Sequence, residues 1–299
     1  MVYDKCVEVA SELKAAAKRN IEEHFNKTGH KKKLAIITGN REDFASQKYV
    51  QTKVKGCEEI GADSQVIYYG EPTNETDILS CLFKSRYNRE WDNERNVEHL
   101  EDNCDGVIIQ LPLAKEVKHL TNELINRIEP TMDVDGLTDF SKNELSLKGT
   151  TKFIPCTALG VLKIIEYRFG KDGIAGKNVV IINRSDLIGK PLAYMLLARN
   201  ATVTICHSHS VDIRALTQCA DIIITAVGKQ NFIDESYFDK TRTTFVVDCA
   251  IVRDENGKVC GDCNKNLYDE NVKFAECTPV PRGVGLTTVA SLLYNLSIT

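Results

Sequence analysis

The sequence predicts an α/β protein with two open α/β domains. Short apolar runs alternate with segments of helical periodicity along most of the 299 residues. Near-continuous apolar strands of this kind are typical of parallel sheets that are covered on both faces. The alternation is interrupted by a polar stretch after "DVDG" at 133–136, which separates two series of strands.

In the first series, a helix is expected at 4–27, where Val7, Ala10, Leu13 and Ala17 follow helical spacing. Three strand–helix units come next. Their strands are expected at 34–38, 64–69 and 105–111, and their helices at 44–60, from residue 75, and at 116–128.

The second series begins with the helix start "PCTALG" at 155–160. We therefore assign residues 1–154 to the first domain and 155–277 to the second, with 278–299 returning to the first. Four strands are expected in the second domain. One helix is expected after the first strand and a second after the second strand, and a last helix follows "TPVPRGVG". The strands are 177–182, 201–206, 221–227 and 244–250, and the further helices are 212–219 and 287–297.

Composition excludes several classes of protein. Apolar residues make up 42% and charged residues 27%, as in ordinary soluble proteins. The net charge of −4 argues against a nucleic-acid-binding protein. The first residues resemble no secretory signal, and no apolar run approaches the ~20 residues of a membrane span. Eleven scattered cysteines, including Cys57, Cys81, Cys206 and Cys219 in apolar runs, indicate reduced core residues. We expect a cytoplasmic protein without a membrane partner.

The loop "NRSDLIG" at 183–189 joins an apolar strand to a helix in the second domain. Such a loop lets backbone N–H groups and a helix N-terminus face a pyrophosphate. Ser185 can donate a hydroxyl, and Gly189 permits close packing of the helix. The loop has fewer glycines than the dinucleotide fingerprint, so an ordinary turn without a nucleotide stays an alternative.

The end of the following strand indicates which nucleotide would bind. An NAD site usually has a carboxylate there for the ribose 2′-hydroxyl. This chain has "CHSHS" at 206–210, without a carboxylate. Arg184, Ser208 and His207 could surround a 2′-phosphate, which favours NADP while leaving NAD possible. A polar strand end in solvent is the competing interpretation.

The helix expected at 44–60 carries a tyrosine and a lysine one turn apart. Asp43 can cap this helix and Gly61 can end it. Its buried stripe is predicted to be Val50, Val54, Cys57 and Ile60, and Tyr49 and Lys53 lie one residue off that stripe. A lysine at the core boundary is partly desolvated, which favours the neutral amine that a base needs. A lysine whose stem merely covers apolar surface is the alternative.

Two further stretches offer polar groups to the same site. Gln110 ends the strand of "DGVIIQ", at the edge where open α/β sheets bind ligands. The loop "MDVDG" offers Asp133 and Asp135, and a carboxylate can pair with a flat amidine-like edge through two hydrogen bonds. We expect Tyr49, Lys53, Gln110 and Asp135 to converge on one cleft.

These segments together resemble one known family. The stretches "ASQKYVQTKVKGCEEIG", "DGVIIQLPL", "DVDG", "PCTALG", "INRSDLIGKP" and "TPVPRGVG" occur in the order seen in the bifunctional methylenetetrahydrofolate dehydrogenase/cyclohydrolase family. The resemblance implies two open α/β domains with a cleft between them, folate on the first, NADP on a Rossmann-like second domain, and a homodimer through the cofactor domains. It implies NADP-dependent oxidation of 5,10-methylenetetrahydrofolate and hydrolysis of the methenyl product to 10-formyltetrahydrofolate.

The resemblance also implies roles for single residues. Lys53 corresponds to the catalytic lysine, Tyr49 to a tyrosine that stacks on the folate, Gln110 to a glutamine beside the lysine, and Asp135 to the carboxylate that grips the pterin. Leu111, Pro281 and Gly283 are the further substrate-binding candidates. The cofactor-binding candidates are Arg184, Ser185, Gly189, His207, Ser208, Gly228, Ile251 and Thr288.

The sequence departs from the family pattern in several places. Arg282 replaces a glycine, and Leu286 and Thr287 replace proline and methionine. Asn183 stands where glycine is common. If the replaced glycine needs a positive φ, Arg282 imposes strain. If that glycine only allows close approach, Arg282 adds bulk and charge near the substrate or cofactor. The altered loop leaves open a catalytically impaired folate- or nucleotide-binding regulator.

Two other enzymes are less well supported by the residues. A dehydrogenase without cyclohydrolase activity would not need Lys53. An unrelated dehydrogenase acting on a small acid would not need the "YVQTK", "QLP" and "DVDG" set.

The stretch "CGDC" at 260–263 allows one more interpretation. A C-x-x-C pair could be redox-active or half of a zinc site, with Cys249 and Cys277 as partners. Zinc sites usually have two such pairs, so neither a metal nor a redox role is the favoured interpretation.

Overall fold

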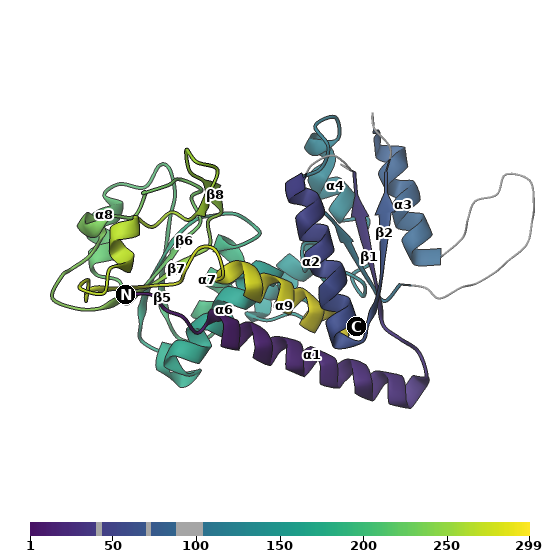
Figure 1. Ribbon diagram of the computed structural model, residues 1–299, viewed down its shortest axis with the longest axis horizontal. Coiled ribbons are helices and arrows are strands. Elements are labelled where there is room, and N and C mark those ends of the chain that lie inside the picture. Colours follow the sequence, from purple (N-terminus) through teal and green to yellow (C-terminus); the bar gives the residue numbers. More distant parts are fainter. Residues whose placement is uncertain (40–43, 70–72, 88–103) are drawn as a thin grey trace, which may run out of the picture. The chain divides into compact units, whose positions relative to one another are not determined.

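The computed structural model describes residues 1–39, 44–69, 73–87 and 104–299 (Figure 1). The chain forms two compact units: unit 1 is Met1–Glu12 with Lys142–Ser291, and unit 2 is Leu13–Ser141 with Leu292–Thr299. Helices α1 (Cys6–Thr28) and α9 (Val284–Ser297) therefore contribute residues to both units. The domain boundaries expected at 154 and 277 stay predictions, and the expected cap Asp43 lies outside the described residues.

Unit 2 contains a parallel three-stranded sheet in the order β2-β1-β3. The helix that follows β1 spans residues 44–60 as expected, and the helix that follows β2 begins at residue 75 as expected. Gly61 has a φ of +81°, which confirms it as the residue that ends α2. The elements are β1 (Lys33–Thr38), α2 (Phe44–Ile60), β2 (Asp63–Tyr68), α3 (Glu75–Tyr87) and β3 (Gly106–Ile109).

The prediction of one helix over residues 116–128 is wrong. The segment forms a 3-10 turn, η1 (Lys118–Leu120), and a short helix, α4 (Thr121–Ile125). The Asn126 side chain donates to Asn122 O at 2.9 Å and accepts from Asp139 N at 2.6 Å. The backbone bond from Asn126 N to Asn122 O is kept, but the next bonds, from Arg127 N to Leu124 O and from Ile128 N to Ile125 O, are of the 3-10 type, so α4 does not continue.

Helix α5 (Asp139–Lys148) was not expected, because the sequence there looked like a polar stretch. Its start is fixed by a buried carboxylate, that of Asp133. This carboxylate accepts from Thr138 N at 2.9 Å, Thr138 Oγ1 at 2.6 Å and Ser141 Oγ at 2.7 Å. The helix therefore depends on a residue that precedes it, which local periodicity does not reveal.

Unit 1 contains a parallel five-stranded sheet in the order β10-β7-β6-β4-β5. The four expected strands are present. The sheet has a fifth strand, β10, which was not expected because its three residues are too few to show a strand period. The elements are α6 (Cys156–Phe169), η2 (Asp172–Ile174), β4 (Asn178–Ile182), α7 (Gly189–Leu197), β5 (Thr202–Cys206), α8 (Ile213–Gln218), β6 (Ile222–Thr225), η3 (Glu235–Tyr237), β7 (Thr244–Asp248), β8 (Val252–Arg253), β9 (Val259–Cys260), η4 (Lys265–Tyr268) and β10 (Ala275–Cys277).

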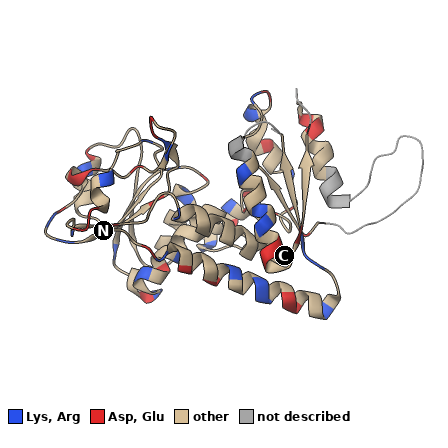
Figure 2. Cartoon of the chain, in the orientation of Figure 1, with Lys and Arg blue, Asp and Glu red and all other residues tan. Residues whose placement is uncertain are grey.

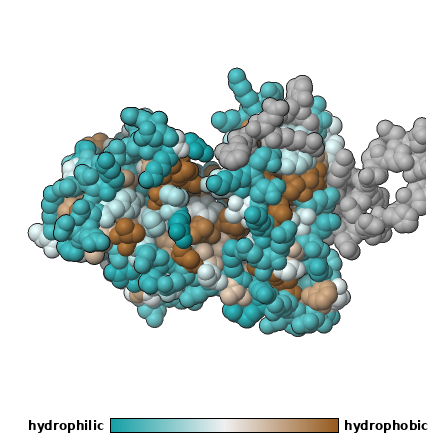
Figure 3. Space-filling view, viewed as in Figure 1, coloured by the Kyte–Doolittle hydropathy of each residue, from teal (hydrophilic) through white to brown (hydrophobic). Residues whose placement is uncertain are grey.

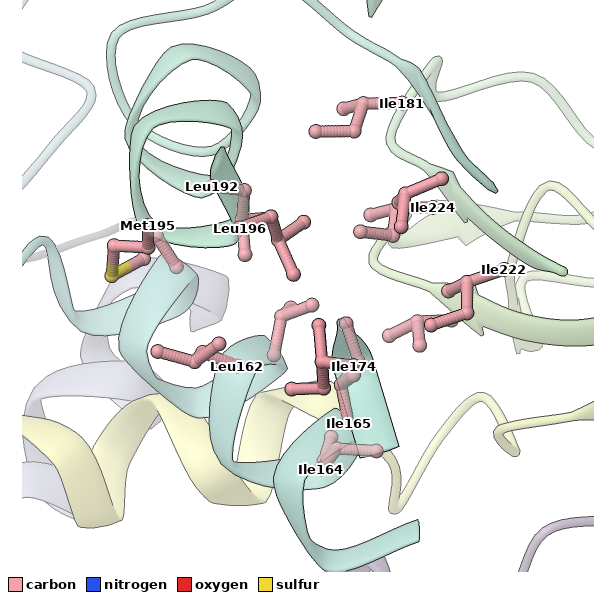
Figure 4. Close-up of a cluster of buried hydrophobic side chains, with 14 of the residues drawn as sticks. Leu162, Ile164, Ile165, Ile174, Ile181, Leu192, Met195, Leu196, Ile222 and Ile224 are labelled. Atoms are coloured by element: carbon pink, nitrogen blue, oxygen red, sulfur yellow. The ribbon is translucent and has the colours of Figure 1, made fainter. Parts of the chain in front are cut away.

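Helices α6 and α7 pack their apolar faces onto this sheet (Figure 4). Leu162 and Leu196 lie against isoleucines of the central strands, among them Ile181 and Ile224, and all four are buried. Burying one such side chain stabilises the fold by about 1.5–3 kcal/mol. The packing fixes the strands and leaves the loops at their carboxyl ends to form a site. The expected α/β class, with parallel sheets, is confirmed.

The surface carries mixed charges. Basic and acidic residues are interspersed along α1 (Figure 2), and hydrophilic residues dominate the face drawn in Figure 3. No helix among the described residues is long and apolar enough to cross a membrane. A cytoplasmic location stays a prediction.

All eleven cysteines are free thiols. Cys57, Cys81 and Cys206 are buried as expected, but the expectation for Cys219 is wrong, because this residue is exposed just after α8.

Candidate functional site

Lys53 lies on α2 with its side chain half-buried, and its Nζ donates a hydrogen bond to Gln110 Oε1 at 2.8 Å. Gln110 directly follows β3, and its own Nε2 donates to Leu111 O at 2.8 Å. Both ends of the Gln110 amide are therefore held, so its oxygen is fixed toward the lysine. The expected pairing of Lys53 with the end of β3 is confirmed.

The core face of α2 explains this position. Val50, Cys57 and Ile60 are buried as predicted, whereas Val54 is only half-buried. Tyr49 lies one turn before Lys53 on the same face and is 41% exposed. Burial of part of its side chain raises the pKa of the Tyr49 hydroxyl. The ring is thus accessible and its hydroxyl stays protonated at neutral pH.

The two aspartates of "MDVDG" differ in environment. Asp133 is fully buried and binds the backbone and hydroxyls at the start of α5. Asp135 is partly exposed, and its carboxylate forms no hydrogen bond or ion pair with a described residue. Its loop is anchored to β3, where Val107 N donates to Met132 O at 2.9 Å. Asp133 is thus structural and Asp135 is free for a ligand, but its convergence with Lys53 stays a prediction.

In unit 1, the loop from 183 to 189 is organised by Asn183. Its Oδ1 accepts from Ser185 N at 2.8 Å, Ser185 Oγ at 2.7 Å and Gly189 N at 3.2 Å. Its Nδ2 donates to Ala226 O at 2.8 Å. The asparagine thus joins the loop after β4 to the loop after β6, a role that a glycine could not have.

The same loop leaves groups free for an anion. A Cβ on Gly189 would lie 2.1 Å from Asn183 O, so only glycine allows this approach of α7 to the strand, as expected. The backbone N–H groups of Asp186 and Leu187 donate to no described residue. Arg184 is exposed and pairs with no described carboxylate.

The register of the sheet brings several cofactor candidates to one edge. Ile182 lies opposite Cys206 and Thr225, and Thr225 lies opposite Asp248. The segments that follow these strands therefore begin side by side at the carboxyl edge. They carry the cofactor candidates Arg184, Ser185, His207, Ser208, Gly228 and Ile251.

His207 and Ser208 belong to a tight turn at this edge. His207 N donates to Ser210 Oγ at 2.9 Å, and His207 Nδ1 accepts from His209 N at 3.2 Å. Ser208 is exposed.

The loop after β6 is held by Asp262, which the sequence analysis missed. This buried carboxylate accepts from Thr225 Oγ1 at 2.6 Å, Val227 N at 2.7 Å, Gly228 N at 2.9 Å and Lys229 N at 2.7 Å. Gly228 adopts a φ of +79° there. Asp262 lies between the two cysteines of "CGDC", and nothing in this local pattern indicates that its carboxylate is buried.

Asp248, at the end of β7, is the second buried carboxylate at this edge. It accepts from Ala250 N at 3.0 Å and Cys263 N at 2.8 Å, and a Cβ on Gly261 would lie 2.2 Å from its Oδ2. Burial raises the pKa of Asp248 to about 6, partly opposed by these backbone donors. The two aspartates thus shape the segment that carries "CGDC".

The thiols of "CGDC" do not resemble a redox pair. A hydrogen bond with Cys277 and burial raise the pKa of the Cys263 thiol, which disfavours the reactive thiolate. Among the described residues, no group of three His, Cys, Asp or Glu side chains could hold a metal ion.

The segment after β10 carries the remaining candidates. Pro281 is exposed and Gly283 is buried. Arg282 has a φ of +76°, so of the two possibilities for the replaced glycine the positive φ applies at this position. Thr288, on α9, donates to Val284 O at 3.0 Å and lies 3.4 Å from Thr157 Oγ1. Nothing in the structure tests whether these residues contact a ligand.

Most of the chain matches two domain models of one family. The profile described as "Tetrahydrofolate dehydrogenase/cyclohydrolase, catalytic domain" matches residues 5–135, and the NAD(P)-binding domain of the same family matches residues 155–299. The chain belongs to the tetrahydrofolate dehydrogenase/cyclohydrolase family. The resemblance inferred from the motifs is therefore confirmed.

Curated and solved members of the family are similar over nearly the full length. "Bifunctional protein FolD" of Agathobacter rectalis is 36% identical over 96% of this chain and 94% of its own. The protein of the same name from Bacillus anthracis is 35% identical over 96% and 92%. The crystal structure of the bifunctional FolD from Campylobacter jejuni has 32% identity and a TM-score of 0.85, covering 99% of this chain and 97% of that one.

The buried carboxyl of Asp248 predicts a pH dependence of stability. Unfolding lowers its pKa from about 6 to the ordinary 3.8, so the native protein keeps the proton that the unfolded chain releases. Its contribution, about 3 kcal/mol, is fully present below pH ~4 and is lost as the pH rises through ~6. Urea unfolding from pH 4.5 to 7.5 should show this decline in the parent protein relative to Asp248→Asn. Parallel curves would contradict the assignment.

Asp239→Asn provides the control for this measurement. Hydrogen bonds from Thr241 lower the pKa of Asp239 below its ordinary 3.8, so this carboxyl is ionised in both the folded and the unfolded protein above pH 4.5. Its removal should therefore leave the pH dependence between pH 4.5 and 7.5 nearly unchanged.

Proposed function

We propose that the chain oxidises 5,10-methylenetetrahydrofolate to the methenyl compound with NADP and hydrolyses the latter to 10-formyltetrahydrofolate. Membership of the family supports both activities. The observation that carries the hydrolytic step is the hydrogen bond between Lys53 Nζ and Gln110 Oε1 at 2.8 Å. A dehydrogenase without the hydrolytic step would not need a lysine held in this way.

For the first step, the residues at the carboxyl edge of the unit 1 sheet fit a dinucleotide. The free N–H groups of Asp186 and Leu187 and the start of α7 suit a pyrophosphate, and Arg184 suits a further phosphate. When bound, the oxidised nicotinamide accepts a hydride from the one-carbon bridge of the folate. Hydride transfer needs no acid or base, so the protein contributes proximity and orientation.

For the second step, water adds to the methenyl carbon, one carbon–nitrogen bond of the ring opens, and one proton is released overall. We assign Lys53 as the group that takes or relays this proton, with Gln110 fixing its orientation. Tyr49, whose ring is accessible, stacks on the folate in this proposal. Asp135, whose carboxylate has no described partner, binds the flat donor edge of the pterin. Leu111, Pro281 and Gly283 complete the proposed substrate contacts.

A catalytically impaired regulator is the second candidate. The observation that favours it is the positive φ of Arg282, because a strained residue in this loop could disturb the site. The Lys53–Gln110 pair favours the enzyme, since a binding protein would not require it.

Substitution of Lys53 separates these functions. Lys53→Ala should lower methenyltetrahydrofolate hydrolysis by about 10²–10⁴-fold, the usual contribution of a positioned acid or base, while NADP binding is retained. The decay of methenyltetrahydrofolate absorbance measures the rate, and fluorescence titration measures NADPH binding. Lys55→Ala, an exposed lysine on the same helix, is the control and should leave both unchanged. Absence of activity in the parent protein would instead support the regulator.

Arg184 should determine the choice of cofactor. We propose that its guanidinium and Ser208 bind the 2′-phosphate of NADP, with His207 nearby. A charged hydrogen bond of this kind contributes about 1.5–3 kcal/mol, so Arg184→Ala should raise the KM for NADP by about tenfold or more and leave the KM for NAD nearly unchanged. Lys190→Ala is the control, because Lys190 already pairs with Asp186 at 2.7 Å. An equal loss for both nucleotides would refute this role.

We further propose a homodimer through strand β5. In the described sheet, β5 pairs with β4 alone, whereas the opposite edge, β10, is bridged by Val2. Ile205 of β5 is 37% exposed. An open edge with an exposed isoleucine suits pairing with a second copy.

Sedimentation should therefore give twice the chain mass of 33.4 kDa for the parent protein and a shift toward monomer for Ile205→Asp. Leu147→Asp, on α5, is the control because Leu147 is also exposed but belongs to a helix and not to the strand that would pair. A monomeric parent at micromolar concentration would contradict the dimer.

A further inference from the structure

Arg282 lies in the segment between β10 and α9, and this segment is attached to the carboxyl end of β7. Thr278 N donates to Val246 O at 3.0 Å, and Asp248 N donates to Thr278 Oγ1 at 2.9 Å. The segment therefore leaves the sheet at the same edge as the cofactor candidates. Arg282 is exposed there.

The backbone at Arg282 is held in a conformation that arginine disfavours. Its φ of +76° is left-handed, which costs a residue with a Cβ roughly 1–2 kcal/mol. The next residue adds to the constraint, because a Cβ on Gly283 would lie 2.2 Å from Pro279 O. The other described non-glycine residues with positive φ are Asn200, Asp212 and Asn231, whose short side chains tolerate this region better. Glycine at 282 would remove the cost, so the arginine is retained against its backbone preference.

The guanidinium of Arg282 forms no hydrogen bond or ion pair with a described residue. Other arginines of unit 1 do have partners: Arg199 binds Glu166 at 2.6 Å and Arg168 binds Glu276 at 2.8 Å. A long cation at a ligand-binding edge, strained and without a carboxylate partner, is suited to an anion from outside the chain.

The order of the strands indicates which anion this is. The proposed phosphate contacts follow β4 and β5, whereas Arg282 follows β10 at the opposite side of the sheet. Three strand spacings of about 4.8 Å separate β10 from β4, on the order of 14 Å. The segment that carries Arg282 therefore leaves the sheet at a strand that β7 and β6 separate from the proposed phosphate contacts. The second substrate must meet the nicotinamide for hydride transfer, and its anionic groups are the carboxylates of its glutamyl tail.

We propose that Arg282 is a specificity-determining residue that binds a glutamyl carboxylate of the folate substrate. The inference rests on the proposed function, since that function makes a folate the second substrate. It adds a recognition contact at a position where glycine would be the unstrained choice.

Kinetics of Arg282→Gly, with mono- and triglutamylated methylenetetrahydrofolate, test this assignment. The KM for the folate should rise about tenfold, while kcat and the KM for NADP stay within about twofold. Arg282→Lys should recover part of the folate affinity, because it restores the charge without the two-pronged donor. If Arg282 contacts a second or third glutamyl residue, the substitution should weaken binding of the triglutamate more than that of the monoglutamate. If Arg282 contacts the first glutamyl residue, binding of both substrates should weaken equally.

Asn200→Gly is the matched control. Asn200 is also exposed, with a φ of +61°, so this change relieves backbone strain away from the loop. Both glycine variants should raise the melting temperature, but only Arg282→Gly should change the KM for the folate.

Three results would overturn the proposal. In the first, Arg282→Gly leaves the KM for the folate unchanged. In the second, it raises the KM for NADP and not the KM for the folate. In the third, it lowers kcat and changes neither KM. Titration calorimetry with tetrahydrofolate, which is not turned over, tests the Arg282 contact separately from the proposed enzymatic function. Arg282-dependent binding by an inactive parent would sustain the contact and refute the enzymatic function. If the parent protein is active and binds tetrahydrofolate equally well without Arg282, the enzymatic function would stand and the contact would be refuted.

Discussion

Buried aspartates that accept backbone hydrogen bonds hold the loops on which the candidate site depends. Asp133 organises the loop that carries Asp135, and Asp262 organises the loop that carries Gly228. Burial of a carboxylate is unfavourable unless donors surround it, and here the donors are the N–H groups that a loop cannot satisfy within itself. Each aspartate therefore fixes one loop conformation, and loss of the carboxylate would free the backbone that presents the site.

The two sheets present their functional groups in the same physical way. A parallel strand ends, and the chain turns at the carboxyl edge with polar groups that the core cannot accept. In unit 2 this edge provides Gln110, which fixes Lys53. In unit 1 it provides Asn183, whose amide connects the loops after β4 and β6. In each case an amide side chain with both ends occupied gives the neighbouring group one orientation.

Much of the fold was predictable because its strands are apolar and its helices are periodic. The strands of both series lie where the sequence placed them, and Gly61 ends α2 through a left-handed φ. The failures have local causes. The segment expected as a helix at 116–128 changes to 3-10 hydrogen bonds on both sides of α4, α5 begins at hydrogen bonds that Asp133 accepts, and β10 has only three residues. Each depends on local hydrogen bonds or on a neighbouring strand, to which periodicity is insensitive.

The sequence by itself determined the family, the α/β class and the pairing of Lys53 with Gln110, because these follow from ordered motifs and from the alternation of strands and helices. Only the tertiary structure decided which carboxylates are structural. Asp133 and Asp135 are two residues apart, yet one is buried among donors and the other is free. The sequence likewise showed Asp262 only as part of a cysteine motif. Burial and hydrogen bonding are set by residues distant along the chain, and these become neighbours only when the sheets form.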